Sequence, residues 1–182
     1  MINDKEYCEL FLKAKRSKEE DKKIQDYNKK LIKDFPFLMP HEILDKEEMQ
    51  TYDYQVTWLD NMPIGWRIAF GIKMCEEIKN QLLRIPSGDS GTLLDNYKIT
   101  DIKEKYGSLC WYDSCDNESI EKIIDKYEKI SWDTCIICGS TATLESAGWI
   151  SPYCEECAKK EYKRVNFKTP FEKVFFPKKE NN

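Results

Sequence analysis

The spacing of apolar residues changes several times along the chain, and each change predicts a helix or a strand. Residues 4–33 carry apolar side chains at helical spacing, namely Tyr7, Leu10, Phe11, Ile24, Tyr27 and Leu31. Ser17 stands three residues before Glu20, which predicts a capping box at the start of a second helix. We therefore expect an N-terminal helical arm over residues 1–34, in two pieces, with charged outer faces.

Two prolines, Pro36 and Pro40, predict that this arm ends near residue 34, because proline interrupts a helix. The apolar residues between them should pack into the core. From residue 52 the pattern alternates, which predicts a strand followed by a turn at residues 60–63. The side chains expected on one face of this strand are Tyr52, Tyr54, Val56 and Trp58.

Residues 65–84 show the clearest helical pattern, with a buried stripe of Trp66, Ala69, Phe70, Met74, Ile78 and Leu82. A flexible loop should follow at residues 86–91, and then two strands at 97–105 and 109–113. Their alternation slips at residues 100–101, which predicts a β-bulge. A last helix, capped by Asp116 or Asn117, should turn five side chains inward: Ile120, Ile123, Ile124, Tyr127 and Ile130. These elements predict an α+β core over residues 35–131, in which a small antiparallel sheet packs with helices.

Four cysteines near the C-terminus carry the most specific signal: Cys135, Cys138, Cys154 and Cys157. Two residues separate the members of each pair and fifteen separate the pairs, which is the spacing of a zinc ribbon. Gly139 supplies backbone freedom after the first pair, and residues 142–150 suit a short hairpin between the pairs. Sites with four cysteine ligands are normally closed, so we expect a structural zinc ion and a ribbon over residues 132–160. Iron and redox-active cysteine pairs are the alternatives.

The remaining cysteines, Cys8, Cys75, Cys110 and Cys115, raise the rival interpretation of a disulfide framework. The first residues contain no apolar segment typical of a secretory signal, and no apolar run is long enough to cross a membrane. We therefore expect free thiols in a reducing cytoplasm. Lysine far outnumbers arginine, a bias common in low-GC bacteria and their phages, so the compartment is a bacterial cell or the host of a phage.

Charge is unevenly distributed. The net charge of −4 and the pI of about 5.3 exclude a general polyanion binder. A basic segment nevertheless follows the cysteines and makes the predicted C-terminal extension, residues 161–182, basic and aromatic. The candidate nucleic-acid contacts are Lys159, Lys160, Lys163, Arg164 and Lys168. Phenylalanines among them would either stack on unpaired bases or pack back as a terminal strand.

No catalytic constellation stands out. Asp101 and Lys103 have the Asp-x-Lys spacing of metal-dependent nucleases, with Asp89 or Asp95 as a second carboxylate. A solvated strand explains the same residues. The single histidine, His41, is too remote in sequence to activate four separate thiols, so cysteine catalysis is disfavoured.

Three blocks together resemble a group of small bacterial and phage proteins described only as hypothetical or zinc-ribbon-containing. The blocks are Gly65–Trp66–Arg67, the run 102–112 (Ile-Lys-Glu-Lys-Tyr-Gly-Ser-Leu-Cys-Trp-Tyr), and the cysteine pairs with Trp149 between them. The resemblance covers residues 62–158 and implies no established activity. At Cys110 the chain departs from that group, which carries arginine there.

These observations predict a non-enzymatic zinc-ribbon module that binds nucleic acid or a nucleic-acid-handling protein. One alternative is a phage factor that binds and blocks a host protein, with acidic clusters at residues 19–21 and 47–48 as its contact surface. The other alternative is the metal-dependent nuclease.

Overall fold

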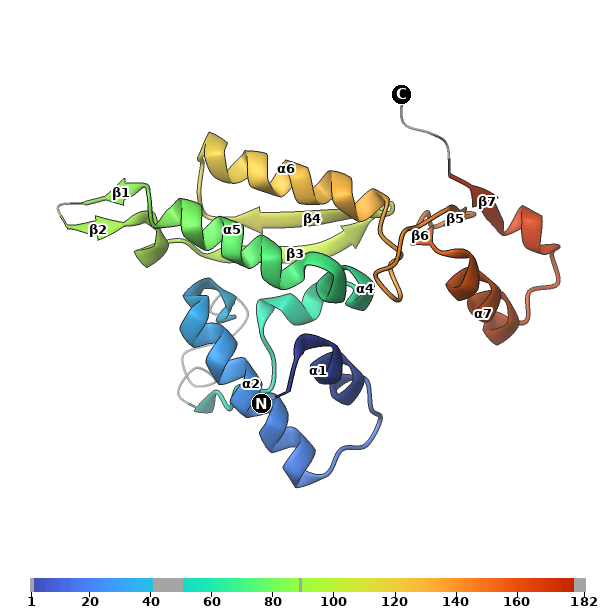
Figure 1. Ribbon diagram of the computed structural model, residues 1–182, viewed down its shortest axis with the longest axis horizontal. Helices are drawn as coiled ribbons and strands as arrows, with labels where there is room; N and C mark the ends of the chain where they lie inside the picture. Colours follow the sequence, from blue (N-terminus) through green and yellow to red (C-terminus); the bar gives the residue numbers. More distant parts are fainter. Residues whose placement is uncertain (1, 41–50, 89, 179–182) are drawn as a thin grey trace.

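The computed structural model describes residues 2–40, 51–88 and 90–178. It is an α+β fold, as the sequence predicts. A central β-hairpin lies against two long helices, the N-terminal helices pack beside this layer, and the four cysteines belong to a module at the opposite end (Figure 1). Three of the sequence-based interpretations rest on His41, on residues 47–48 and on Asp89, which lie outside the described residues.

The N-terminal arm forms two helices, α1 (Asp4–Phe11) and α2 (Lys18–Asp34). The predicted capping box is confirmed, because the Ser17 side chain accepts from the Glu20 amide and the Glu20 carboxylate accepts from the Ser17 amide. Asn3 and Glu6 form a second box at the start of α1. Both helices bury apolar residues in the same cluster as the central elements, so their inner faces are part of the main core.

The segment after α2 enters that core. A short 3₁₀ helix, η1 (Pro36–Leu38), buries Phe37 and Leu38, in agreement with the sequence. The predicted strand at residues 52–58 is wrong: the chain instead forms the 3₁₀ helix η2 (Trp58–Asn61). Two features explain the difference. Tyr54 has a left-handed backbone with φ of +64°, and the Asp60 carboxylate accepts from the amide and hydroxyl of Thr57, which favours a helical turn.

The predicted helix at residues 65–84 is present in three parts: α4 (Ile64–Trp66), a π-helical turn η3 (Arg67–Gly71) and α5 (Ile72–Leu82). The expected stripe is buried except for Ala69, which is exposed. A π-helical turn is wider than an α-helical one, so residues three apart no longer share a face. Residues 86–91 were expected to be a flexible loop, but β1 (Pro86–Ser87) and β2 (Gly91–Thr92) pair as an antiparallel ladder. The 3₁₀ helix η4 (Leu93–Asp95) follows.

The central hairpin consists of β3 (Ile99–Lys105) and β4 (Ser108–Asp113), and the predicted bulge is confirmed between Ile99 and Asp101. Helix α6 (Glu118–Trp132) begins at the Asn117 cap and packs against β4 and α5. Among its predicted inward residues, Ile130 is instead exposed near the C-terminal end of the helix.

The C-terminal module has its own small core. Strand β5 (Leu144–Ser146) lies between β6 (Pro152–Tyr153) and β7 (Phe175–Pro177), and all pairs are antiparallel. Helix α7 (Glu155–Val165) and the 3₁₀ helix η5 (Phe171–Lys173) complete it. The hairpin expected within residues 142–150 therefore extends to residue 153. Within the described parts of the chain, no helix has the length and apolarity needed to span a membrane.

Candidate metal centre

The four predicted ligands come together in space. The Sγ atoms of Cys135, Cys138, Cys154 and Cys157 all lie within 4.8 Å of one another, and those of Cys138 and Cys154 are 3.7 Å apart. A tetrahedral zinc ion with Zn–S bonds of about 2.3 Å requires sulfurs about 3.8 Å apart. No other group of three or more potential metal ligands occurs among the described residues. The donor set therefore fits a tetrahedral thiophilic ion.

The first pair is presented by a tight turn. The Cys135 amide donates to the Ser140 carbonyl at 2.7 Å, and the Gly139 amide donates to the Cys135 carbonyl at 3.0 Å. Gly139 has φ of +79°, the left-handed conformation that glycine adopts without strain. The predicted role of Gly139 is confirmed.

The second pair lies at the start of a helix. Cys154 is the N-cap of α7, and its Sγ accepts from the Cys157 amide at 3.4 Å. This bond directs the Cys154 sulfur toward the first turn of α7, where Cys157 is buried. The positive end of a helix dipole also stabilises thiolate character at such a position.

The thiols differ in their tendency to ionise. Burial raises the pKa of Cys135 and of Cys157. Burial also opposes ionisation of Cys138, but hydrogen bonds from Ser140 outweigh it and lower the Cys138 pKa to about 6. Four thiolates within 5 Å would repel one another strongly, and a divalent cation removes this repulsion because it keeps coordinating thiols deprotonated.

The first cysteine turn is held against the core by the helix that begins at residue 64. The Gly65 amide donates to the Ile136 carbonyl at 2.9 Å, and the Trp66 indole donates to the Thr134 carbonyl at 2.9 Å. The approach is so close that a Cβ atom on Gly65 would lie 2.1 Å from the Cys135 carbonyl oxygen. The metal centre is therefore packed directly on the main core.

A second contact joins the module to the tip of the central hairpin. The Trp149 indole donates to Glu104 at 2.7 Å and stacks on Tyr106, with ring centroids 5.7 Å apart. The same Glu104 carboxylate accepts from the Gly107 amide at 2.6 Å. Gly107 lies so near Ile150 that a Cβ atom there would be 3.3 Å from the Ile150 carbonyl oxygen.

Compared with models of protein families, with curated proteins and with solved structures, the chain has no match.

The predicted nucleic-acid contacts lie on or just after α7, and three of the five form ion pairs with glutamates of that helix. The pairs are Lys159–Glu155, Lys160–Glu156 and Arg164–Glu161. Lys163 and Lys168 are exposed and have no ion pair with any described residue. The sequence interpretation counted only Glu161 and Glu172 as opposing charges, and it missed the two glutamates one turn earlier on α7.

The aromatic residues of this segment pack mainly against one another. Tyr162 stacks on Phe167 and meets Phe171 edge-on, and Phe171 stacks on the buried Phe175. These rings form the small core of the module, with β7 as a terminal strand. The packing alternative considered for this segment is therefore the one observed for Phe175.

The nuclease candidates are not assembled into a carboxylate cluster among the described residues. Asp101 pairs with Lys103 on the exposed side of β3. Asp95 accepts from the Thr92 amide at 2.8 Å and closes the turn of η4.

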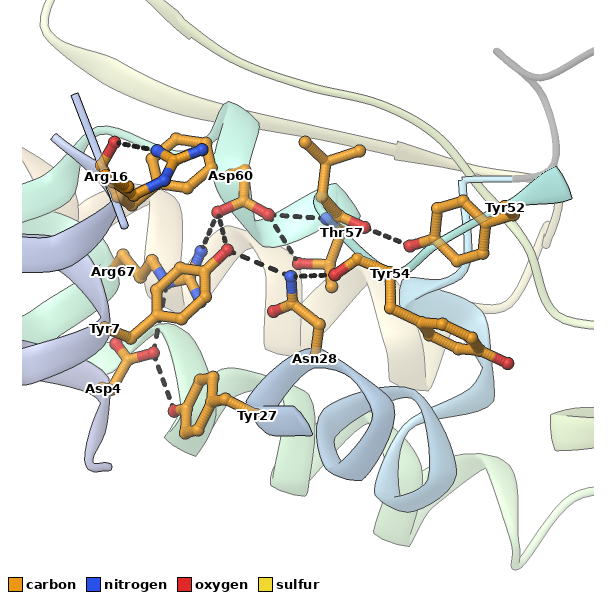
Figure 2. Close-up of polar contacts among 12 residues, drawn as sticks. Asp4, Tyr7, Arg16, Tyr27, Asn28, Tyr52, Tyr54, Thr57, Asp60 and Arg67 are labelled. Carbon is orange, nitrogen blue, oxygen red and sulfur yellow. Dashed lines mark hydrogen bonds and ion pairs between the residues drawn. The ribbon is translucent and has the colours of Figure 1, made fainter. Parts of the chain in front are cut away.

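Sequence analysis missed a buried charged network around Arg67 (Figure 2). The side chain of Arg67 is 2% exposed and binds Asp60 at 2.5 Å and Asp4 at 3.1 Å. The Arg67 guanidinium also lies 4.2 Å from the Tyr7 ring centroid, and the Tyr7 hydroxyl donates to Asp60 at 2.9 Å. Asn28 donates to Tyr7, and burial raises the pKa of Tyr7 well above its ordinary value.

The network joins α1, α2, η2 and η3, so it fixes how the N-terminal helices sit on the core. One signal in the sequence could have revealed it. Arg67 is the only charged residue between Asp60 and Lys73, and a lone charge within an apolar run is stable only when it is paired.

Proposed function

We propose that the protein is a non-enzymatic zinc-binding module that contacts nucleic acid through its C-terminal part. The convergence of four cysteine sulfurs into one cluster is the observation that carries the metal assignment. Sites with four sulfur ligands hold zinc or iron, and zinc suits a closed structural role because it has no redox chemistry. The ion would hold the first cysteine turn and the start of α7 together and so stabilise the module.

Metal analysis of the purified protein tests the first part. One zinc ion per chain, with no visible iron absorption, is the expected result. Cys154→Ser should lose the metal and lower the thermal stability of the module, because a structural zinc site contributes folding free energy. Cys115→Ser is the matched control, since Cys115 is a partly buried thiol outside the cluster. A wild-type protein without stoichiometric metal, or a Cys154→Ser variant that retains it, would refute the assignment.

Charge asymmetry supports the second part. Residues 155–178 contain seven lysines and arginines against four glutamates, although the whole chain has a net charge of −4. The three ion pairs on α7 are exposed, and exposed pairs contribute at most about 1 kcal/mol. Their lysines and arginine can therefore exchange a glutamate for a phosphate at small cost. Lys163 and Lys168 need no exchange.

Fluorescence anisotropy of labelled oligonucleotides tests this part, with zinc-loaded protein at low and moderate salt. The expected result is binding that weakens as salt increases, because lysines release counterions from phosphates. A Lys163→Ala, Lys168→Ala double variant should weaken binding and flatten its salt dependence by about 0.7 per lost contact on a single strand. Lys122→Ala, on the exposed side of α6, is the control and should bind normally. Absence of binding at low salt would exclude nucleic acid as the partner.

A further inference from the structure

Two aromatic rings lie exposed where the central hairpin meets the cysteine module. Trp149 is 62% exposed and Tyr106 is 57% exposed, although each ring covers part of the other. Because their inner faces are turned toward each other, most of this exposure belongs to their outer faces and edges. Exposed aromatic pairs are unusual on a protein surface, where large rings are normally buried.

The pair is held rigidly. Glu104 accepts from the Trp149 indole with one carboxylate oxygen and from the Gly107 amide with the other. Tyr106 has a left-handed backbone with φ of +53°, set by the hairpin turn that it shares with Gly107. The rings therefore need little ordering when a flat ligand stacks on them, and preorganisation of this kind raises affinity.

Two lysines accompany aromatic rings along the same hairpin. Lys105 Nζ lies 5.8 Å from the ring centroid of Tyr106, and Lys103 Nζ lies 5.0 Å from that of Tyr112, which is also exposed. Lys105 has no ion pair with a described residue, whereas Lys103 pairs with Asp101. The hairpin thus presents rings with cations beside them, and the adjoining module carries the positively charged segment 155–178.

We propose that Tyr106 and Trp149 form a stacking platform for the unpaired bases of a single-stranded nucleic acid. This inference rests on the proposed nucleic-acid function and names its substrate class. Bases would stack on the outer faces of the two rings, while Lys105 and the basic residues of α7 contact phosphates. A duplex hides the faces of its bases, so the platform selects single strands.

The position of the pair supports this choice of ligand over a folded protein partner. Trp149 lies in the connection between β5 and β6, and α7 begins two residues after β6. The tip of the β3–β4 hairpin points toward this module (Figure 1). A flexible strand can therefore pass from the rings to the lysines of α7. The rings within the module cannot serve the same purpose, because they pack on one another.

Anisotropy and tryptophan fluorescence test the platform in the full-length, zinc-loaded protein, with labelled oligothymidine and a matched duplex as probes. Trp149 should dominate the fluorescence response, since the other four tryptophans are buried or half-buried: Trp58, Trp66, Trp111 and Trp132. We expect tighter binding of the single strand and quenching as it binds. Trp149→Ala should reduce affinity about tenfold, the typical effect of losing one stacked base. Trp149→Phe should retain most of it.

Zinc content and thermal stability of each variant separate a loss of stacking from a loss of fold. Leu12→Ala, which shortens an exposed apolar side chain on the N-terminal helices, is the control for surface changes. Unchanged affinity in Trp149→Ala and Tyr106→Ala would overturn the platform, as would equal binding of the duplex without quenching. If binding responds only to Lys163 and Lys168, the proposed function stands and the platform falls. If no oligonucleotide binds, the proposed function itself fails.

Discussion

Replacement of Gly65 by alanine tests whether the metal centre is seated on the core. The added Cβ would lie 2.1 Å from the Cys135 carbonyl oxygen and 2.6 Å from the carbonyl carbon of Ile136. Both are backbone atoms of the cysteine turn, so no side-chain rotation can relieve the clash. The turn must move away, and the 2.9 Å hydrogen bond from the Gly65 amide to Ile136 would be lost with it.

The size of the effect follows from three contributions. Overpacking at a close contact costs about 1–3 kcal/mol, and loss of a backbone hydrogen bond adds about 1 kcal/mol. Alanine's higher helix propensity returns up to about 1 kcal/mol. We therefore expect Gly65→Ala to lower the free energy of unfolding by about 1–3 kcal/mol and to weaken zinc binding, because Cys135 moves with the turn.

Gly71→Ala is the matched control in the same helical segment. Its Cβ would meet nothing nearer than 3.5 Å, which is ordinary van der Waals contact. Only the helix-propensity gain applies there, so this variant should be as stable as the wild type or more stable. The assay is urea unfolding of zinc-loaded protein together with competition for zinc by a chelator. If Gly65→Ala unfolds at the wild-type urea concentration and holds zinc equally well, the argument for a seated metal centre is refuted.

Two further predictions concern the N-terminal helices. Arg67→Met should lower the free energy of unfolding by about 3–5 kcal/mol, because Asp60 and Asp4 would keep buried charges without their partner, whereas Arg16→Met, at a partly exposed pair, should change it by less than about 1 kcal/mol in the same urea titration. A hydrogen bond from Lys13, followed by one from the Ser17 amide, lowers the pKa of Glu20 from 4.5 to about 2. This depressed pKa stabilises the fold above pH 4.5, and the stabilisation is lost as the pH falls toward 2. Glu20→Gln should therefore be less stable than wild type at neutral pH, and the two stability curves should converge near pH 2; parallel curves would contradict the assignment.

Local signals allowed much of the fold to be predicted from the sequence. The Ser17–Glu20 box, the Asn117 cap and the bulge beside Asp101 each depend on neighbouring residues, and all three are present. The cysteine spacing likewise specifies the ligand set, and the four sulfurs converge as expected. These features are determined within a few residues or by a well-defined coordination geometry.

The failures occurred where a distant contact or a competing local bond decided the structure. Alternating aromatics favoured a strand at residues 52–58, but the Asp60 carboxylate stabilises a helical turn there. The charges on α7 were counted without the i, i+4 pairs to Glu155 and Glu156. The buried position of Arg67 depends on Asp4, 63 residues away, and sequence spacing holds no information about such a partner.

The residues on which the family resemblance rests acquire a common role in three dimensions. Gly65 and Trp66 contact the first cysteine turn, while Glu104, Tyr106 and Gly107 contact the segment around Trp149. Short motifs far apart in sequence would occur together if one interface required all of them. We propose that the cysteine pairs and their seat on the core form one inseparable unit.

The departure at Cys110 is compatible with this proposal. Cys110 lies opposite Lys103 in the hairpin register, on the face that also carries Asp101 and away from the contacts of Glu104 with Trp149. Exchange of arginine for cysteine at this position therefore alters the exposed face of the hairpin and leaves the seat of the metal centre intact. A Cys110→Arg variant should accordingly bind zinc as the wild type does, and a loss of zinc affinity in that variant would show that the hairpin face and the metal centre are coupled.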